Sequence, residues 1–149
     1  MTSETHILFV CKYNRFRSVM AEALFNKLNK LPHVKAKSAG AIRGSPLDAT
    51  IIAVAREHGL KIKKSTSSLT YSLMKWQTLT VVVADDVPAS LFKKNKKQGK
   101  NVLAWNIPDT WKLSKGKRDD LSTMRKIVRR IELRVRDLLE DLEKEPLKN

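Results

Sequence analysis

The stretch HILFVCKYNRFRS, residues 6–18, decides the fold of this chain. Its first five residues are an apolar run that leads into Cys11, which is typical of a strand buried on both faces of a parallel sheet. From Ser18 to Lys30 the apolar residues recur with helical spacing, so we predict a helix there. The residues between Cys11 and Ser18 therefore form a loop that joins a buried strand to a helix.

The same alternation of strands and helices continues to the end of the chain. The further strands are predicted at residues 34–38, 79–84 and 101–105, and the further helices at 47–58, 69–75, 87–94 and from 121 onward. Such alternation is typical of a sheet with helices on both faces. We therefore expect an α/β fold, a three-layer α/β/α arrangement around a four-stranded parallel sheet, with residues 1–149 as a single domain. The last helix has heptad-like spacing, but it is only about three heptads long, which favours a helix that covers the sheet over a coiled coil.

Composition excludes several classes of protein. Hydrophobic residues make up 42% of the chain, which is enough for a core, and no apolar run reaches the roughly 20 residues of a membrane span. The apolar run at residues 7–10 is too short for the core of a signal peptide. The chain has 1 Cys, so no intrachain disulfide can form. We expect a cytoplasmic protein with no membrane partner.

The formal net charge of +15 allows two interpretations. One is a surface that binds nucleic acid or another polyanion. The other is a solvated basic surface on a protein that works elsewhere. No aromatic residues alternate with the basic clusters and no zinc-ligand spacing occurs, which favours the second interpretation. The basic clusters are Lys93, Lys94, Lys96, Lys97 and Lys100, and then Arg125, Lys126, Arg129 and Arg130.

The chemistry of the chain is expected in the loop from Cys11 to Ser18. A loop between a strand and a helix can direct successive backbone N–H groups inward, and the helix N-terminus adds further donors, so an oxyanion would bind there. Arg17 offers a planar fork for two oxygens of that anion. Such surroundings favour the thiolate of Cys11 and so a nucleophile. The alternative is an inert buried thiol, which this strand–loop–helix context disfavours.

Two further loops should meet this one. In a parallel sheet the site lies at the carboxyl ends of the strands. The loops at 84–88 and 106–118 follow the third and fourth predicted strands, so they end at the same edge as the loop after Cys11. We expect no cofactor and no metal, because His, Cys and carboxylates do not cluster with ligand spacing.

Several motifs resemble the low-molecular-weight protein tyrosine phosphatase family, whose fold is shared by related arsenate reductases. The resemblance covers nearly the whole chain and is most specific at the N-terminus, where the loop is similar to archaeal members. It implies a phosphate-binding loop between the first strand and the first helix. The motifs that carry it are residues 7–11, Asn14, Arg17, Ser18, residues 20–25, 38–40 and 46–48, and more weakly Asp85 and residues 107–109.

The family's mechanism carries over to matching positions. The resemblance implies that Cys11 is the nucleophile, that Arg17 binds the phosphate oxygens, and that Ser18 stabilises the leaving thiolate. It places the general acid at Asp109, although here Pro108 precedes that residue, where the family commonly has a proline after it. Asp119 and Asp120 are rivals that we interpret as caps of the last helix, and Asp85 would support its loop.

The loop also departs from the family. Lys12, Tyr13 and Arg15 stand where small or apolar residues are frequent, and Phe16 stands where many members have a second cysteine. A basic rim favours acidic substrates and disfavours cationic ones such as phosphoarginine. The expected substrate-binding residues are Lys12, Tyr13, Asn14, Arg15, Phe16 and Trp111.

The expected function is hydrolysis of a phosphomonoester, foremost phosphotyrosine in a protein, through a phosphocysteine on Cys11. Phosphate and vanadate are expected inhibitors, and nucleic acid is a disfavoured partner. One alternative is an arsenate reductase that uses an external small thiol, because the chain has no further cysteine for a disulfide relay. Another is a protein that binds RNA or another polyanion and keeps a vestigial site.

Overall fold

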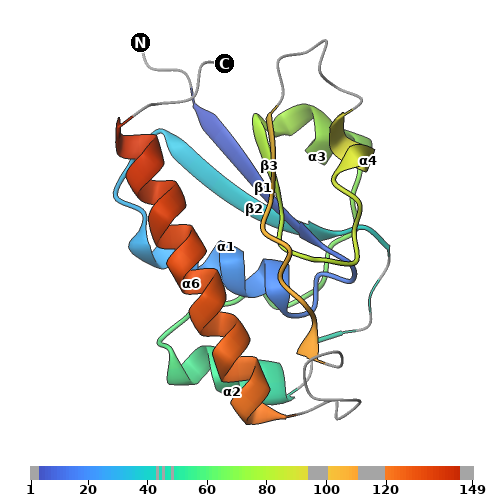
Figure 1. Ribbon diagram of the computed structural model, residues 1–149, viewed down its shortest axis with the longest axis vertical. Helices are drawn as coiled ribbons and strands as arrows, with labels where there is room; N and C mark the ends of the chain where they lie inside the picture. Colours follow the sequence, from blue (N-terminus) through green and yellow to red (C-terminus); the bar gives the residue numbers. More distant parts are fainter. Residues whose placement is uncertain are drawn as a thin grey trace.

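The computed structural model describes residues 4–42, 44, 46–47, 49–93, 101–110 and 120–144. The strands are β1 (Thr5–Cys11), β2 (Val34–Gly40), β3 (Leu79–Val82) and β4 (Asn101–Ala104), and the helices are α1 (Arg17–Leu28), α2 (Ala49–Glu57), α3 (Tyr71–Trp76), α4 (Ser90–Lys93) and α6 (Leu121–Lys144). The four strands pair in parallel in the order β2-β1-β3-β4. Helices α1, α2 and α6 lie on one side of the sheet, and α3 and α4 on the other (Figure 1). The predicted α/β fold with a four-stranded parallel sheet is confirmed.

Strand β1 lies inside the sheet and is buried on both faces. Phe9 belongs to the core beneath α1 and α6, whereas Leu8 and Val10 belong to the second core beneath α3 and α4. Successive side chains of a strand point to opposite faces, so a strand between two helical layers needs apolar residues at consecutive positions. That requirement explains the unbroken apolar run that precedes Cys11.

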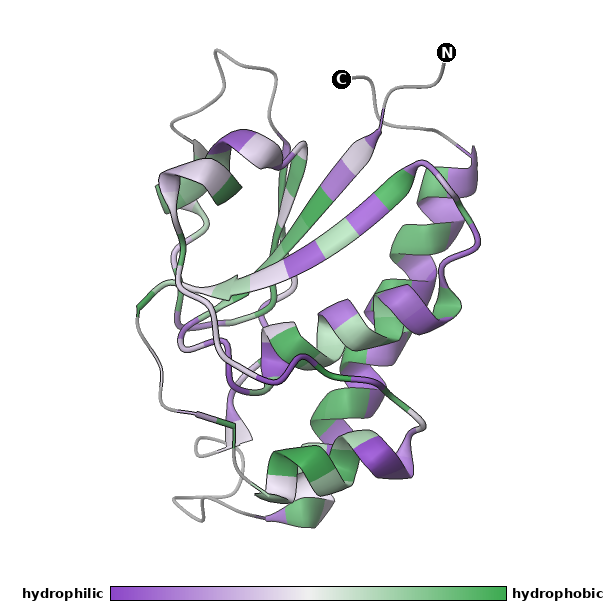
Figure 2. Ribbon diagram, turned by 180° about the vertical axis from the view of Figure 1, so that it is seen from behind, coloured by the Kyte–Doolittle hydropathy of each residue, from purple (hydrophilic) through white to green (hydrophobic). Residues whose placement is uncertain are grey.

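Helix α6 covers one face of the sheet and packs against α1 and α2. Bands of hydrophobic and hydrophilic residues alternate along it, as Figure 2 shows. Its apolar stripe lies in the same core as Phe9, as expected for a covering helix. The buried apolar residues of the stripe are Met124, Ile127, Val128, Ile131, Val135, Leu138, Leu139 and Leu142.

The bounds of several elements differ from the predicted ones. Strand β2 runs to Gly40 rather than residue 38, because each residue from Val34 to Gly40 pairs in register with β1, ending with Gly40 opposite Cys11. Strand β3 ends at Val82, although the buried Val83 still donates its N–H to the carbonyl of Val10 at 2.7 Å. Helix α4 begins at Ser90 rather than at residue 87.

Neither a membrane helix nor a metal cluster occurs in the ranges that the structure describes. Within them no helix combines the length and the apolar character needed to cross a bilayer. The same ranges contain no group of three or more His, Cys, Asp or Glu side chains arranged to hold a metal ion.

Candidate functional site

The loops that follow β1, β3 and β4 meet at the carboxyl edge of the sheet, and Arg17 joins them. Its Nη1 donates to the carbonyl oxygen of Ile107 at 2.9 Å, and its Nη2 donates to Asp86 Oδ2 at 3.2 Å. Ile107 follows β4 and Asp86 follows β3, while Arg17 is the first residue of α1. The three loops that were expected to meet are therefore connected through Arg17.

Cys11 ends β1 and is 2% exposed. Its Sγ lies 3.0 Å from Ser18 Oγ, in the first turn of α1. Phe16 precedes the helix as its N-cap and gives it no side-chain capping bond. The positive end of α1 therefore faces the loop with backbone donors that no cap residue occupies, which suits an anion bound beside Cys11.

The side chain of Asn14 connects the loop to its neighbours by hydrogen bonds. It is fully buried and adopts a φ of 55°, in the left-handed region that Asn tolerates better than most residues. Its Nδ2 donates to Ser18 Oγ at 2.7 Å and to Ser38 Oγ at 3.0 Å, and its Oδ1 accepts from the backbone N–H of Ser67 at 2.8 Å. These contacts tie the loop to β2 and to the segment before α3.

The contacts of Asn14 limit the directions of the hydrogen bonds in this network. An amide nitrogen only donates, so Ser18 Oγ accepts from Asn14, and the hydroxyl hydrogen of Ser18 remains available to donate to a thiolate at Cys11. By the same reasoning Ser38 accepts from Asn14 and donates its hydroxyl hydrogen to Glu22 Oε1. A serine that donates to Cys11 stabilises the thiolate over the thiol.

Arg17 is 5% exposed and lies between two acids. Asp86 Oδ1 is 3.1 Å from its Nη2, and Asp85 Oδ1 is 3.9 Å from its Nη1. Carboxylates at this distance hold a guanidinium in one orientation and compensate its charge inside the protein. Asp85 was expected to support its loop. The stronger contact of Asp86 was missed, although the pair of acids directly after β3 was a signal for it.

Gly40 allows β2 to approach the loop. A Cβ on Gly40 would lie 2.6 Å from the carbonyl carbon of Tyr13 and 2.8 Å from the backbone nitrogen of Asn14, both too close for a real side chain. Its N–H donates to Ser67 at 2.7 Å and its carbonyl accepts from Leu69 at 2.9 Å. The absence of a side chain at residue 40 therefore determines how close the loop lies to β2.

The predicted rim residues differ in exposure: Tyr13 is exposed, Lys12 and Arg15 are half-buried, and Phe16 is buried. Tyr13 is 41% exposed, and the Lys12 ammonium lies 5.2 Å from the centre of its ring. Arg15 Nε donates to the carbonyl oxygen of Pro46 at 3.4 Å. The side chain of Phe16 is buried in the core with α1, which leaves its backbone N–H as the group that can face a phosphate.

The candidates that follow β4 are placed in part. Asp109 is half-buried and lies two residues after Ile107, whose carbonyl oxygen contacts Arg17. Trp111 and Asp119 lie outside the described residues. Trp105, which directly precedes the loop at 106–118, is buried and packs on Phe9 with ring centres 5.7 Å apart.

Asp120 caps helix α6. Its Oδ1 accepts from the backbone N–H of Ser122 at 3.1 Å, and its Oδ2 accepts from the hydroxyl of Thr123 at 2.8 Å. Both are contacts of a helix N-cap, which is the role expected of Asp120. Asp109 is the residue that was preferred over it as the general acid.

Comparisons with known proteins agree with this geometry. Residues 6–148 match the model of the family described as low molecular weight phosphotyrosine protein phosphatase. An arsenate reductase from Archaeoglobus fulgidus is 31% identical, with 90% of this chain and 98% of that chain covered and a TM-score of 0.67.

Two more distant structures share the fold. A low molecular weight protein tyrosine phosphatase from T. tengcongensis is 24% identical, covers 93% of this chain and 100% of its own, and has a TM-score of 0.77. The YwlE arginine phosphatase from Geobacillus stearothermophilus is 23% identical, covers 94% of both chains, and has a TM-score of 0.71. A search of curated proteins gives no match. The family match extends over nearly the whole chain, and this protein belongs to the low molecular weight phosphotyrosine protein phosphatase family.

Proposed function

We propose that this protein hydrolyses phosphotyrosine in proteins through a phosphocysteine intermediate on Cys11. The observation that carries the proposal is the 3.0 Å contact between Cys11 Sγ and Ser18 Oγ at the N-terminus of α1, where Ser18 Oγ also accepts from Asn14. A thiolate stabilised in this way beside backbone donors is suited to attack a bound phosphate. Membership of a phosphatase family supports the same chemistry.

The first step transfers the phosphoryl group to the enzyme. The Cys11 thiolate attacks phosphorus, the S–P bond forms as the P–O bond to the tyrosyl oxygen breaks, and Asp109 gives its proton to the departing oxygen. Arg17 binds the equatorial oxygens, over which negative charge is spread in the transition state. Asp86 and Ile107 hold the guanidinium for this task.

The second step restores the enzyme. Asp109, now ionised, takes a proton from a water molecule whose oxygen attacks the phosphocysteine. The S–P bond breaks, inorganic phosphate forms, and the electron pair stays on Cys11. The hydroxyl of Ser18, 3.0 Å from that sulfur, can donate to it and so lowers the energy of the thiolate as it leaves.

The rim supports a preference among phosphosubstrates. Lys12, Arg15 and the exposed ring of Tyr13 border the loop. Cations attract acidic residues that flank a phosphotyrosine and repel a guanidinium, so phosphoarginine is disfavoured. Tyr13 can also pack against a substrate ring, with Trp111 as the second wall. A cytoplasmic location is part of the proposal and agrees with an active thiol in a chain that has no other cysteine.

Arsenate reduction is the second candidate function. The 31% identity to an arsenate reductase from Archaeoglobus fulgidus favours it. Arsenate and phosphate share shape and charge, so the same loop would hold either anion. The chain has 1 Cys, and reduction would therefore need a small external thiol as the electron donor.

The deciding experiment compares two activities in wild type and Cys11→Ser. Release of phosphate from a phosphotyrosyl peptide should be lost in the variant, whereas vanadate should still bind, because the loop and Arg17 remain. Reduction of arsenate with glutathione should be slow in both. Fast glutathione-dependent reduction with negligible phosphate release would favour the second function.

Arg17→Lys refines the experiment, because it keeps the charge and removes the planar fork. It should lower kcat by about 10²–10³-fold, the scale for losing one transition-state donor. Arg129→Lys, an exposed position on α6, is the matched control and should leave kcat unchanged. Equal activities for the two variants would contradict the role given to Arg17.

A further inference from the structure

Lys63 brings a cation to the network beneath the loop. It lies on the segment between α2 and α3, and its Nζ donates to the carbonyl oxygen of Ser38 at 2.9 Å. Ser38 is also the residue whose hydroxyl joins Asn14 to Glu22. The neighbouring Lys61 and Lys64 are exposed, whereas Lys63 is half-buried. One lysine of this basic segment thus points inward.

The surroundings of the Lys63 ammonium are anionic. Burial lowers the pKa of Lys63, since desolvation disfavours the charged form, and the negative charges of Glu22 and Cys11 oppose that shift. Glu22 comes from α1 and Cys11 from β1. Burial of an ammonium costs free energy unless anions compensate its charge. Here the compensating groups are Cys11, the proposed nucleophile, and Glu22, which accepts from Ser38.

We propose that Lys63 is a positioning residue whose ammonium balances the Glu22 carboxylate and so keeps the surroundings of Cys11 favourable to the thiolate. This inference rests on the proposed role of Cys11 as the nucleophile. Lys63 does not touch the substrate in this proposal. It acts through Ser38, Asn14 and Ser18, and through its charge.

The physical argument concerns two opposite charges near one sulfur. The Glu22 carboxylate accepts from Ser38 and alone would disfavour a second negative charge on Cys11. The positive charge of Lys63, which interacts with both Glu22 and Cys11, opposes that effect. Water and salt screen charges inside the protein less than those at the surface, so the exposed Lys64 cannot replace it.

The test measures alkylation of the single thiol by iodoacetamide as a function of pH, which reports the thiolate without any turnover. Lys63→Met should shift the midpoint of the profile to higher pH and slow alkylation near neutral pH by roughly threefold to tenfold. Lys63→Arg should restore the wild-type profile in large part. Lys64→Met, which removes the same charge one residue away at an exposed position, should leave the profile unchanged.

Glu22→Gln should shift the alkylation profile in the opposite direction. The amide oxygen of Gln can still accept from Ser38, but the negative charge is gone, so the midpoint should shift to lower pH. The double variant Lys63→Met/Glu22→Gln should lie near wild type. A structural role alone would weaken stability in both single variants and would not produce shifts of opposite sign.

The outcomes separate this inference from the proposed function. If Lys63→Met and Lys64→Met have the same alkylation profile as wild type, the role of Lys63 is overturned, whatever the phosphatase activity. If the alkylation profiles shift as expected but neither the wild type nor any variant releases phosphate, the electrostatic role of Lys63 stands and the proposed function fails. Unfolding curves in urea for each variant show that the folded protein is being alkylated.

Discussion

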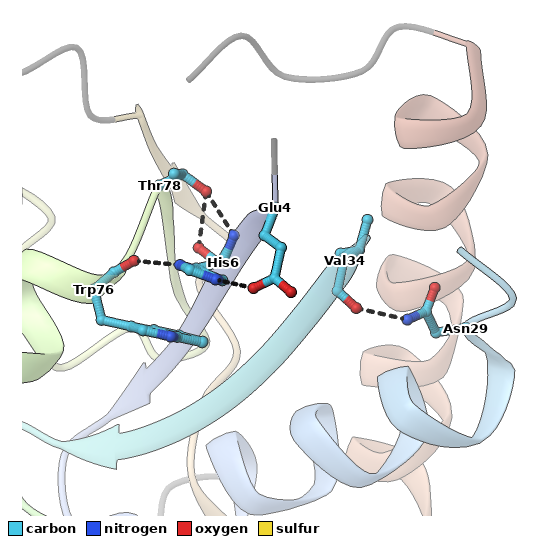
Figure 3. A network of polar contacts seen from close by, with 6 residues as sticks. All are labelled: Glu4, His6, Asn29, Val34, Trp76 and Thr78. Atoms are coloured by element: carbon cyan, nitrogen blue, oxygen red, sulfur yellow. Dashed lines mark hydrogen bonds and ion pairs between the residues drawn. The ribbon is translucent and has the colours of Figure 1, made fainter. Parts of the chain in front are cut away.

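The two ends of strand β1 carry two polar networks of different character. At its start, His6 stacks on Trp76 with ring centres 4.4 Å apart, and its Nδ1 and Nε2 lie 2.8 and 2.9 Å from Trp76 O and Glu4 Oε2 (Figure 3). Thr78 adds bonds to the backbone of the same residue. At the end of the strand, Asn14 connects Ser18 and Ser38 beneath the loop that follows Cys11.

The difference lies in what water can replace. Glu4 is exposed, so solvent can take its place beside His6 when a bond breaks. Asn14 and Ser18 are fully buried, and a lost partner there leaves an unsatisfied polar atom. In the exposed network, water can replace a lost hydrogen-bond partner, whereas in the buried network each hydrogen bond is needed to hold the loop in one conformation. A functional site that requires a fixed loop conformation is therefore expected at the buried end of β1.

The largest expected effect tests whether the chemistry extends beyond the buried network to the segment after β4. Asp109→Asn should lower turnover of phosphotyrosine by ~10²–10⁴-fold, the usual worth of general acid catalysis. The loss should be smaller for p-nitrophenyl phosphate, whose leaving group departs without full protonation. Initial rates on both substrates check it. Asp120→Asn is the control, and a strong leaving-group dependence there instead would move the acid to the start of α6.

Two asparagines give a matched comparison of the two ends. Asn14→Ala should lower kcat by about 10²-fold, because loss of these hydrogen bonds displaces the loop. Asn29 also makes three hydrogen bonds, two from Nδ2 to Leu31 and Val34 and one to its Oδ1, but at the far end of β2 (Figure 3). Asn29→Ala should cost roughly 1 kcal/mol of stability and leave kcat unchanged. Urea unfolding and kcat measured together decide the comparison.

Two glycines extend the comparison between the loop and the rest of the molecule. Gly40→Ala would push a Cβ against the backbone of Tyr13 and should lower kcat by about tenfold or more. Gly59 has a φ of 65° after α2, away from the loop, so Gly59→Ala should cost about 1 kcal/mol of stability without a change in kcat. A Gly40→Ala enzyme with normal kcat would show that the loop tolerates displacement.

The smallest effect concerns pH and the exposed network. The hydrogen bond from His6 lowers the pKa of Glu4, with smaller contributions from the charges of His6 and Lys35. A carboxyl whose pKa is lowered by folding adds stability above its unfolded value and loses it as pH falls through the folded value. Glu4→Gln should therefore be slightly less stable than wild type at neutral pH, and the two should converge as the pH falls below the ordinary pKa of a glutamate and through the lowered one. Denaturant midpoints across this range check it, and kcat should not change.

Local patterns predicted the elements and the nucleophile loop. The apolar run before Cys11 and the helical spacing after Ser18 are short-range signals, so β1 and α1 follow from them directly. Asn is one of the few residues that tolerate the left-handed region, and the φ of 55° at Asn14 agrees with that property. The role of Cys11 and its partners in catalysis stays a prediction.

The rest of the site depends on contacts between distant segments. Lys63 reaches Ser38 across 25 residues, and Ser67 reaches Asn14 across 53. Nothing in the sequence near Lys63 separates it from Lys61 and Lys64, because only the tertiary arrangement turns one of them inward. The choice of Asp86 over Asp85 as the closer partner of Arg17 depends on loop geometry in the same way.

The burial of Phe16 also bears on how long the enzyme would survive peroxide. Cys11 is the only cysteine of the chain, and the residue where many relatives have a second thiol is here a ring packed into the core. A sulfenic acid on Cys11 would have no neighbouring thiol with which to condense, so a protective disulfide could form only with a thiol from outside. Where no such thiol is present and oxidation proceeds to the sulfinic acid, the loss of activity would be permanent, and recovery would require synthesis of new protein.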